Sequence, residues 1–187
     1  DLLTDDVTRF TALVEDLLEI SRYDVGTASL RAEPIDLVEF VRQSVHHSPY
    51  DVVTDVGALE HLVVAGDKRR LAQVVVNLVD NAAKYGAGEI RVAVGHEDEF
   101  AIIAVEDEGP GVPEAERGVI FDRFSRGSAG GRRGQGTGSG LGLALVAEHV
   151  GLHGGEVWVD NRLDGCEGAR FTVRIPIGDV PDDEEWA

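Results

Sequence analysis

Cysteine, methionine and long apolar runs are scarce or missing in this sequence of 187 residues. The single cysteine, Cys166, excludes a disulfide within the chain and is typical of a protein from a reducing compartment. No apolar run reaches the roughly 18 residues of a membrane-spanning helix, so nothing in this sequence is predicted to cross a membrane. The sequence starts at Asp1 and contains no Met, and we therefore expect it to be a piece of a longer protein.

Basic residues are also scarce. Lys and Arg together number 17 against 35 Asp and Glu, which gives a net charge of −18. Such a chain repels phosphate backbones, which argues against nucleic acid as a partner. Its length allows one sizeable core and an appendage.

The segment 71–82 has the pattern of an amphipathic helix. Its apolar residues recur at helical spacing and are Leu71, Val74, Val75, Leu78, Val79 and Ala82. At about 100° per residue, Asn77, Asn81 and Lys84 fall together on the flank of this stripe, and Tyr85 lies near its edge. Short amides are mediocre helix formers, which favours a binding surface, although a solvated polar flank explains this helix equally well.

A predicted buried strand, 100–106, runs directly into the segment Asp107-Glu108-Gly109-Pro110-Gly111. Its glycines permit a tight turn and a close approach of a ligand to the main chain. The carboxylate of Asp107 can accept a hydrogen bond from an exocyclic amine. Taken alone, this segment is ordinary loop punctuation.

A glycine-rich loop, 136–142, precedes a second predicted helix that ends near His153. Its alternating glycines leave backbone N–H groups free to surround an anion, and the helix offers its N-terminus to the same charge. The loop follows no strand, which argues against a dinucleotide fingerprint, and no Gly-Lys-Ser/Thr follows, which argues against a Walker loop. A flexible linker is the alternative, but the packing expected of Leu141 and Leu145 favours an ordered site.

These segments, taken in order, resemble four sequence boxes of the ATP-binding catalytic domain of sensor histidine kinases, which belong to a wider family with gyrase, Hsp90 and MutL. Residues 77–85 (NLVDNAAKY) are similar to the N box and residues 107–111 to the G1 box. Residues 120–126 (IFDRFSR) are similar to the F box and residues 138–143 (GSGLGL) to the G2 box. Four boxes in this order are a highly specific signal, and the resemblance covers nearly the whole chain.

The resemblance implies an α+β two-layer sandwich, in which a mixed β-sheet is covered by helices on one face, preceded by one N-terminal helix. Residues 1–26 would be the second helix of a dimerisation and phosphoacceptor hairpin, and 27–34 a linker. Residues 35–178 would be the ATP-binding catalytic domain, and 179–187 an acidic tail.

The N-terminal helix is supported by a heptad-like apolar seam. The seam consists of Leu3, Val7, Phe10, Val14, Leu17 and Ser21. A helix packed on its own domain is the alternative for so short a seam.

The resemblance also implies ATP and Mg²⁺ as cofactors. Asn77, Lys84 and Arg126 would be catalytic, and Asn81 would bind the metal with support from Asn77. Lys84 and Arg126 would meet phosphates, Tyr85 would pack beside the base and Asp107 would read the adenine amine. The full set of predicted nucleotide-binding residues is Asn77, Asn81, Lys84, Tyr85, Asp107, Gly109, Gly111, Val112, Ile120, Phe124, Arg126, Gly138, Ser139, Gly140, Leu141, Gly142, Leu143 and Thr172.

Two further segments complete the predicted site. Residues 127–136, together with Arg126, are expected to form a mobile basic lid, with a solvated loop as the alternative. The turn 164–168 is similar to a G3 box, but Ala169 stands where many relatives have Thr, so a hydroxyl role is absent there. Phe121 is expected to be a core residue rather than a ligand contact.

None of the six histidines lies in the phosphoacceptor setting of the family. We therefore expect the substrate histidine upstream of Asp1, which would leave this piece unable to phosphorylate itself, and each histidine here to be structural or solvated. His149 and His153 could form a metal pair at i, i+4, but no acidic third ligand with suitable spacing accompanies them.

Asn77 stands where the ATPase relatives carry a glutamate that activates water, and an amide cannot accept that proton. The sequence therefore favours phosphoryl transfer to a protein histidine over hydrolysis. The implied partners are a response-regulator receiver domain and, in the full-length protein, a second copy. The implied location is the cytoplasmic part of a membrane-anchored bacterial receptor, with any anchor outside this sequence. Alternatives are a non-catalytic nucleotide-binding or dimerisation module and an anti-sigma-factor serine kinase.

The other predicted elements follow from local pattern. Asp36 is expected to cap a helix, with Glu39 completing a capping box. Short strands are predicted at 52–56, 62–65 and 90–94, and a short helix after Pro113. A strand hairpin is predicted from 156–160 and 169–175.

Overall fold

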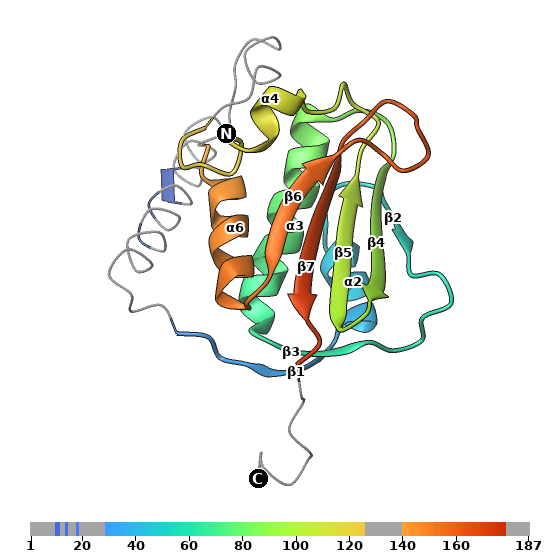
Figure 1. Ribbon diagram of the computed structural model, residues 1–187, viewed down its shortest axis with the longest axis vertical. Coiled ribbons are helices and arrows are strands. Elements are labelled where there is room, and N and C mark those ends of the chain that lie inside the picture. The colour runs from blue at the N-terminus through green and yellow to red at the C-terminus, as the bar shows by residue number, and fades with distance from the viewer. Residues whose placement is uncertain (1–9, 12–13, 15–17, 19–28, 126–139, 179–187) are drawn as a thin grey trace, which may run out of the picture.

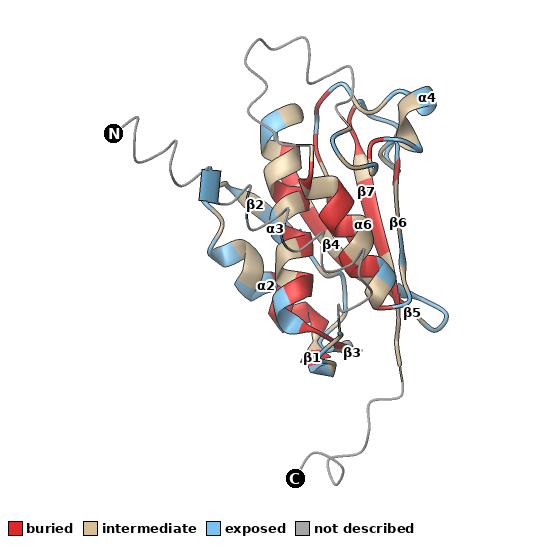
Figure 2. Cartoon of the chain, turned by 90° about the vertical axis from the view of Figure 1, so that its left-hand side faces the viewer, coloured by how far each residue is buried: buried red, intermediate tan, exposed pale blue. Residues whose placement is uncertain are grey.

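A five-stranded mixed sheet and a layer of helices make up most of the described part of the chain (Figure 1). The computed structural model describes residues 29–125 and 140–178, together with Phe10, Thr11, Val14 and Leu18. The strand order is β2-β4-β5-β7-β6, in which β2 is parallel to β4 and the other neighbours are antiparallel. The helices cover one face of the sheet, as Figure 2 shows, so the predicted α+β two-layer sandwich is confirmed.

The elements have the following bounds. The strands of the large sheet are β2 (Val52–Asp55), β4 (Ile90–Glu97), β5 (Phe100–Glu106), β6 (Glu156–Asp160) and β7 (Arg170–Pro176). The helices are α2 (Leu37–His46), α3 (Lys68–Tyr85), α4 (Glu114–Arg117) and α6 (Gly142–Leu152).

Helix α3 forms because its apolar stripe has the core to pack against. All six residues of the predicted stripe are buried. The helix begins at a capping Asp67, whose side chain accepts the N–H of Arg70 at 3.2 Å. It ends at Gly86, whose N–H donates to the carbonyl of Ala82 at 2.9 Å.

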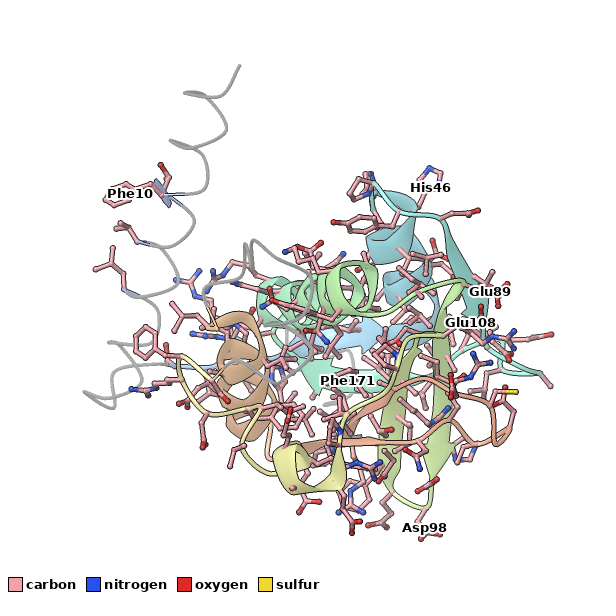
Figure 3. All side chains as sticks on the ribbon, turned by 90° about the horizontal axis from the view of Figure 1, so that it is seen from above. Phe10, His46, Glu89, Asp98, Glu108 and Phe171 are labelled. Carbon is pink, nitrogen blue, oxygen red and sulfur yellow. The ribbon has the colours of Figure 1, made fainter. Side chains whose placement is uncertain are left out.

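The sheet contributes the other half of the core by strand alternation. Phe171, Val173 and Ile175 of β7 are at most 2% exposed and belong to the main apolar cluster. Figure 3 shows Phe171 between the sheet and the helices. Phe121 packs edge-on against Phe171 with ring centres 6.4 Å apart, which confirms its predicted core role.

A second, two-stranded sheet was not predicted. Strand β1 (Glu33–Asp36) pairs antiparallel with β3 (Val63–Gly66), so the chain is already ordered as a strand within the segment expected to be a linker. The partner lies about thirty residues away, and a local pattern of four residues does not reveal a pairing over that separation.

Asp36 ends β1 and caps α2, as predicted. Its carboxylate accepts the N–H of Val38 at 3.1 Å and contacts Nδ1 of His61 at 2.6 Å. The side chain of Glu39 accepts a hydrogen bond from Gln43, four residues further along α2.

The N-terminal segment is described at four positions only, and all four are helical. Phe10, Val14 and Leu18 are 68%, 38% and 57% exposed. The pairing of this helix with a second chain stays a prediction, and the acidic tail at 179–187 lies outside the described residues. Among the residues that the structure describes, no helix is long and apolar enough to span a membrane.

Candidate functional site

The C-terminal part of α3 and the N-terminus of α6 meet at one end of the molecule (Figure 1). A Cβ added to Gly142 would lie 3.5 Å from Oδ1 of Asn77, so the first residue of α6 rests against the N-box amide. Asn81 is half-buried one helical turn further along α3. The structure therefore brings the N box and the G2 box together, as the sequence predicted.

The side chain of Asn77 is incompletely bonded. Its Nδ2 atom is buried and has no hydrogen-bond partner among the described residues. Buried amide N–H groups almost always have an acceptor, and an exception calls for an explanation. This atom is therefore a candidate donor to a bound ligand.

Asp107 lies at the same end of the fold, directly after β5. It is 4% exposed, and its Oδ1 accepts the N–H of Gly109 at 2.7 Å. The end of α3 lies against it, because a Cβ added to Gly86 would meet Cβ and Cγ of Asp107 at 2.6 Å. The N–H of Asp107 donates to the carbonyl of Ala169 at 3.1 Å, which joins this corner to the start of β7.

Burial raises the pKa of the Asp107 carboxyl above its usual value. Hydrogen bonds from the backbone at Gly109 and Ala169 oppose this effect. The result is a desolvated acceptor among small residues, in which a hydrogen bond to an incoming amine is stronger than it would be in water.

The next residue, Glu108, bonds to the loop that precedes β4. Its carboxylate accepts the N–H of Glu89 at 3.3 Å, and its own N–H donates to the carbonyl of Ala87 at 2.9 Å. The two glutamates lie side by side in Figure 3. These bonds fix the turn that carries Asp107 and leave the Glu108 side chain on the surface.

The F box is tied to the G2 box by the backbone. The N–H of Phe124 donates to the carbonyl of Gly140 at 2.9 Å, and Arg123 pairs with Glu148 of α6 at 3.0 Å. Gly140 has a φ of +71°, and a Cβ there would lie 2.9 Å from the Phe124 backbone. Glycine is therefore required at this crossing. Phe124 itself has a φ of +62°, which is rare for an aromatic residue, and is 63% exposed.

Several predicted contact residues are core residues in the structure. Ile120 and Leu141 are buried, and Val112 and Leu143 are partly buried against the main cluster. Leu141 packs with Leu145, as predicted for an ordered loop end. These apolar side chains hold the boxes in place.

Lys84 and Tyr85 close α3 at the same end. Lys84 is exposed and pairs with Asp80, one turn earlier, at 3.0 Å. An exposed pair of this kind contributes less than about 1 kcal/mol, so the ammonium can exchange it for a phosphate. Tyr85 is half-buried beside Gly86.

Thr172 was predicted to contact the nucleotide, and its position in β7 argues against that role. It lies between Phe171 and Val173 in β7, and both of these side chains pack in the core under the helices. Strand alternation therefore turns Thr172 to the opposite face of the sheet, away from Asn77.

Three predicted site residues, Arg126, Gly138 and Ser139, lie outside the described residues. The predicted lid at 127–136 lies there as well. Their roles stay predictions.

Two further glycines contact Asp107: Gly86, which the sequence reasoning missed, and Gly168, the last residue of the turn that is similar to a G3 box. Gly86 has no unusual φ, but its lack of a Cβ lets α3 touch Asp107. Gly168 has a φ of +145° and packs on the backbone of Asp107. The placement of Gly86 directly after the N box was the available signal.

No group of three or more His, Cys, Asp or Glu residues capable of holding a metal occurs in the described ranges. Mg²⁺ does not require one, because it keeps several waters and binds through one or two protein oxygens together with substrate phosphates. The amide oxygens of Asn77 and Asn81 on one flank of α3 suit this mode.

The family model described as "Histidine kinase-, DNA gyrase B-, and HSP90-like ATPase" matches residues 66–179. The chain belongs to this family. Within it, the chain is 36% identical over 184 residues to the signal transduction histidine-protein kinase AfsQ2 of Streptomyces coelicolor, which covers 98% of this chain and 34% of that protein.

Solved histidine kinases share the fold. The histidine kinase AdeS of Acinetobacter baumannii is similar with a TM-score of 0.74 at 26% identity, covering 95% of this chain and 83% of that one. Full-length ShkA in complex with AMPPNP is similar with a TM-score of 0.70 at 30% identity, covering 89% and 35% of the two chains. The described fold is thus the ATP-binding catalytic domain of the sensor histidine kinase type. The chain spans about a third of the length of the curated relatives it matches.

The opposite end of α3 carries a buried polar cluster. The N–H of Asp67 donates to Nε2 of His153 at 3.0 Å, and Nδ1 of His153 donates to the carbonyl of His149 at 2.7 Å. Arg70 contacts Nδ1 of His149 at 3.3 Å and donates to the carbonyl of Ser29. Both histidines of the i, i+4 pair are therefore structural.

The pKa values in this cluster follow from burial and bonding. Burial lowers the pKa of His153, which agrees with a neutral ring that accepts at Nε2. Burial alone would raise the pKa of Asp67, but it is lowered, because hydrogen bonds from the N–H groups of Arg70 and Arg31 and the charge of Arg70 together outweigh that effect.

Proposed function

We propose that this domain transfers the γ-phosphate of Mg·ATP to a histidine outside this sequence, from which it passes to an aspartate of a response-regulator receiver domain. The observation that carries the proposal is the buried Nδ2 of Asn77 beside Gly142, an atom that has no hydrogen-bond partner within residues 29–125 and 140–178. The amide of Asn77 lies at the start of α6, and the N-terminus of a helix favours an anionic group.

The residues divide by chemistry. Asp107, in its desolvated corner, accepts a hydrogen bond from the adenine amine, and Tyr85 packs beside the base. Asn81 ligates Mg²⁺ with support from Asn77, and the bound metal neutralises charge on the phosphates. Lys84 and Arg126 contact the phosphates, and the backbone at Gly138, Ser139, Gly140 and Gly142 surrounds them.

Asn77 also decides between transfer and hydrolysis. An amide cannot take a proton from water as a carboxylate can, so this position supplies no general base for hydrolysis. In phosphoryl transfer, the protein mainly positions the reacting groups and stabilises charge, and a histidine side chain is itself a competent nucleophile.

The test has two steps. Calorimetry compares Mg·ATP binding by the wild type, Asn81→Ala and a matched control, Gln73→Ala, which removes an amide from the same helix two turns earlier. Binding should be lost in Asn81→Ala and kept in the control.

The second step adds a separately purified phosphoacceptor hairpin of a histidine kinase and looks for acid-labile phosphohistidine. Transfer that requires Asn81 supports the proposal. Tight Mg·ATP binding without transfer to any hairpin would favour a non-catalytic nucleotide-binding module.

A further inference from the structure

A groove of about 570 Å³ lies between α2 and the first turns of α3, away from the nucleotide-binding end. It is lined by Arg31, Glu33, Phe40, Gln43, Ser44, His47, Asp67, Lys68, Arg69 and Ala72. Three lining residues of α2 and His47, which follows the helix, lie at i, i+3, i+4 and i+7, so the groove follows one face of that helix. Phe40 and Ala72 give it an apolar floor, and its size is that of a site for a ligand or a side chain.

The rim of this groove is basic. Arg31, Lys68 and Arg69 are exposed, and Glu33 is the exposed acid among the lining residues. This reverses the balance of the whole chain, in which acids outnumber bases by 35 to 17. Lys68 and Arg69 also open α3, whose first turn contains no acid. Cations at a helix N-terminus oppose the helix dipole. An anionic segment placed there would be stabilised both by the basic side chains and by the dipole.

The chain itself supplies such a segment close by. Residues 179–187 read DVPDDEEWA, with five acids and Trp186. They follow Gly178, where an added Cβ would lie 3.7 Å from the Cβ of Ala65 in β3. Strand β3 ends at Gly66, and Asp67 and Lys68 follow directly. Figure 2 shows β1 and β3 at the end of the molecule where α2 and α3 begin.

The reach is sufficient. Nine extended residues span at most about 30 Å, whereas the ten residues of α2 rise about 15 Å. A segment that leaves beside β3 can therefore pass the rim and follow the groove along α2.

We propose that residues 179–187 dock in the α2–α3 groove of their own chain. The acids at 182–185 lie along the rim formed by Arg31, Lys68 and Arg69, and the ring of Trp186 covers the floor at Phe40. The charge of the rim and the point at which the chain leaves β7 carry this assignment.

Tryptophan fluorescence tests it directly. The chain has two tryptophans, Trp158 and Trp186, so Trp158→Phe leaves Trp186 as the sole reporter. Acrylamide should quench Trp186 several-fold less in this protein than in the free peptide DVPDDEEWA. Adding Lys68→Glu and Arg69→Glu should raise quenching to the peptide level. Adding Arg42→Glu, an exposed α2 residue outside the groove lining, should leave the protection intact.

A charge swap completes the test. Asp182→Lys, Asp183→Lys and Glu184→Lys, combined with the Lys68→Glu and Arg69→Glu changes, should restore the protection, with circular dichroism confirming that each variant is folded. If acrylamide quenches Trp186 in the protein as strongly as in the free peptide, the proposal is wrong. Protection that ignores the rim charges would also overturn it, as would protection that grows with protein concentration, which would indicate a second copy instead.

Discussion

The two ends of the antiparallel α3–α6 pair differ in how their polar groups are satisfied. At the end that carries Asp67 and Arg70, buried polar groups bond to His149, to His153 and to the carbonyl of Ser29. At the other end, Nδ2 of Asn77 is buried without a hydrogen-bond partner in the part of the chain that the structure describes, and Asp107 lies among glycines. Both ends contain buried polar atoms, and at the first end these groups bond to one another across segments that are far apart in the chain. The end with Asp67 and Arg70 holds the fold together, whereas the end with Asn77 and Asp107 has the buried polar groups expected of a ligand-binding site.

The largest expected effect comes from closing the space beside Asp107. In Gly86→Ala, the new Cβ would lie 2.6 Å from the Asp107 side chain. We expect overpacking to lower the free energy of unfolding by about 1–3 kcal/mol. We also expect ATP affinity to fall on the order of 100-fold, because a hydrogen bond to a charged group is lost. Calorimetry measures both. Gly118→Ala is the matched control, because nothing lies within 4 Å of its added Cβ; equal ATP affinity in the two variants would contradict the assignment of Asp107.

Breaking the hydrogen bond between Asp67 and His153 should lower the stability of the domain and leave ATP binding unchanged. In His153→Ala, the N–H of Asp67 loses its acceptor while it remains buried. We expect a loss of about 1–3 kcal/mol in the free energy of unfolding, measured by urea denaturation. ATP affinity, compared under conditions where the variant is folded, should stay close to that of the wild type. A large loss of ATP affinity would show that the two ends are not separable.

The same histidine gives a pH dependence. Burial lowers the pKa of folded His153 below the usual value of 6.5, so protonation favours the unfolded chain. Its stabilising contribution is therefore present above pH 6.5 and is lost as the pH falls through the lowered pKa. Thermal unfolding followed between pH 7.5 and 5 should show a smaller acid-induced loss in His153→Gln than in the wild type. An identical pH profile in both proteins would count against a neutral His153.

At the ligand end, Asp107→Asn tests recognition of the base. The amide has one acceptor oxygen in place of two, while the N–H of Gly109 still requires one. We expect ATP affinity to fall on the order of 10-fold, with much less effect on a purine nucleotide that lacks the exocyclic amine. Competition binding with both nucleotides measures this. A uniform loss for the two would assign Asp107 a purely structural role.

The smallest effect is expected for Lys84→Ala. Its pair with Asp80 is exposed, so the stability should change by less than about 1 kcal/mol. A contact with phosphate predicts a several-fold loss of affinity for ATP and little loss for adenosine. Equal losses for ATP and adenosine would remove Lys84 from the phosphate site.

The same comparison shows what the sequence could predict. The N-box stripe and the amides on its flank are local in the chain, so helical periodicity located them correctly. The contact of Asn77 with Gly142 was available only through the resemblance, because it joins residues 65 positions apart. Thr172 was included among the nucleotide-binding residues, although strand alternation from the buried Phe171 turns it away from the helix side of the sheet.

Local sequence patterns could not predict the hydrogen bonds at the end that carries Asp67 and His153. His153 and Asp67 are 86 positions apart, and nothing in the spacing of either residue announces their hydrogen bond. Strand β1 was missed for the same reason, since its partner β3 is a distant segment. Arg70 is also buried, which is uncommon for an arginine and which no pattern in the sequence indicated.

Helix α3 is one uninterrupted rod of 18 residues, about 27 Å long. Its first turn is bonded to the incoming chain, because Asp67 accepts the N–H of Arg31 and Arg70 donates to the carbonyl of Ser29. The segment at Ser29 and Arg31 and the turn that carries Asn81 and Lys84 are therefore joined to the two ends of a single helix.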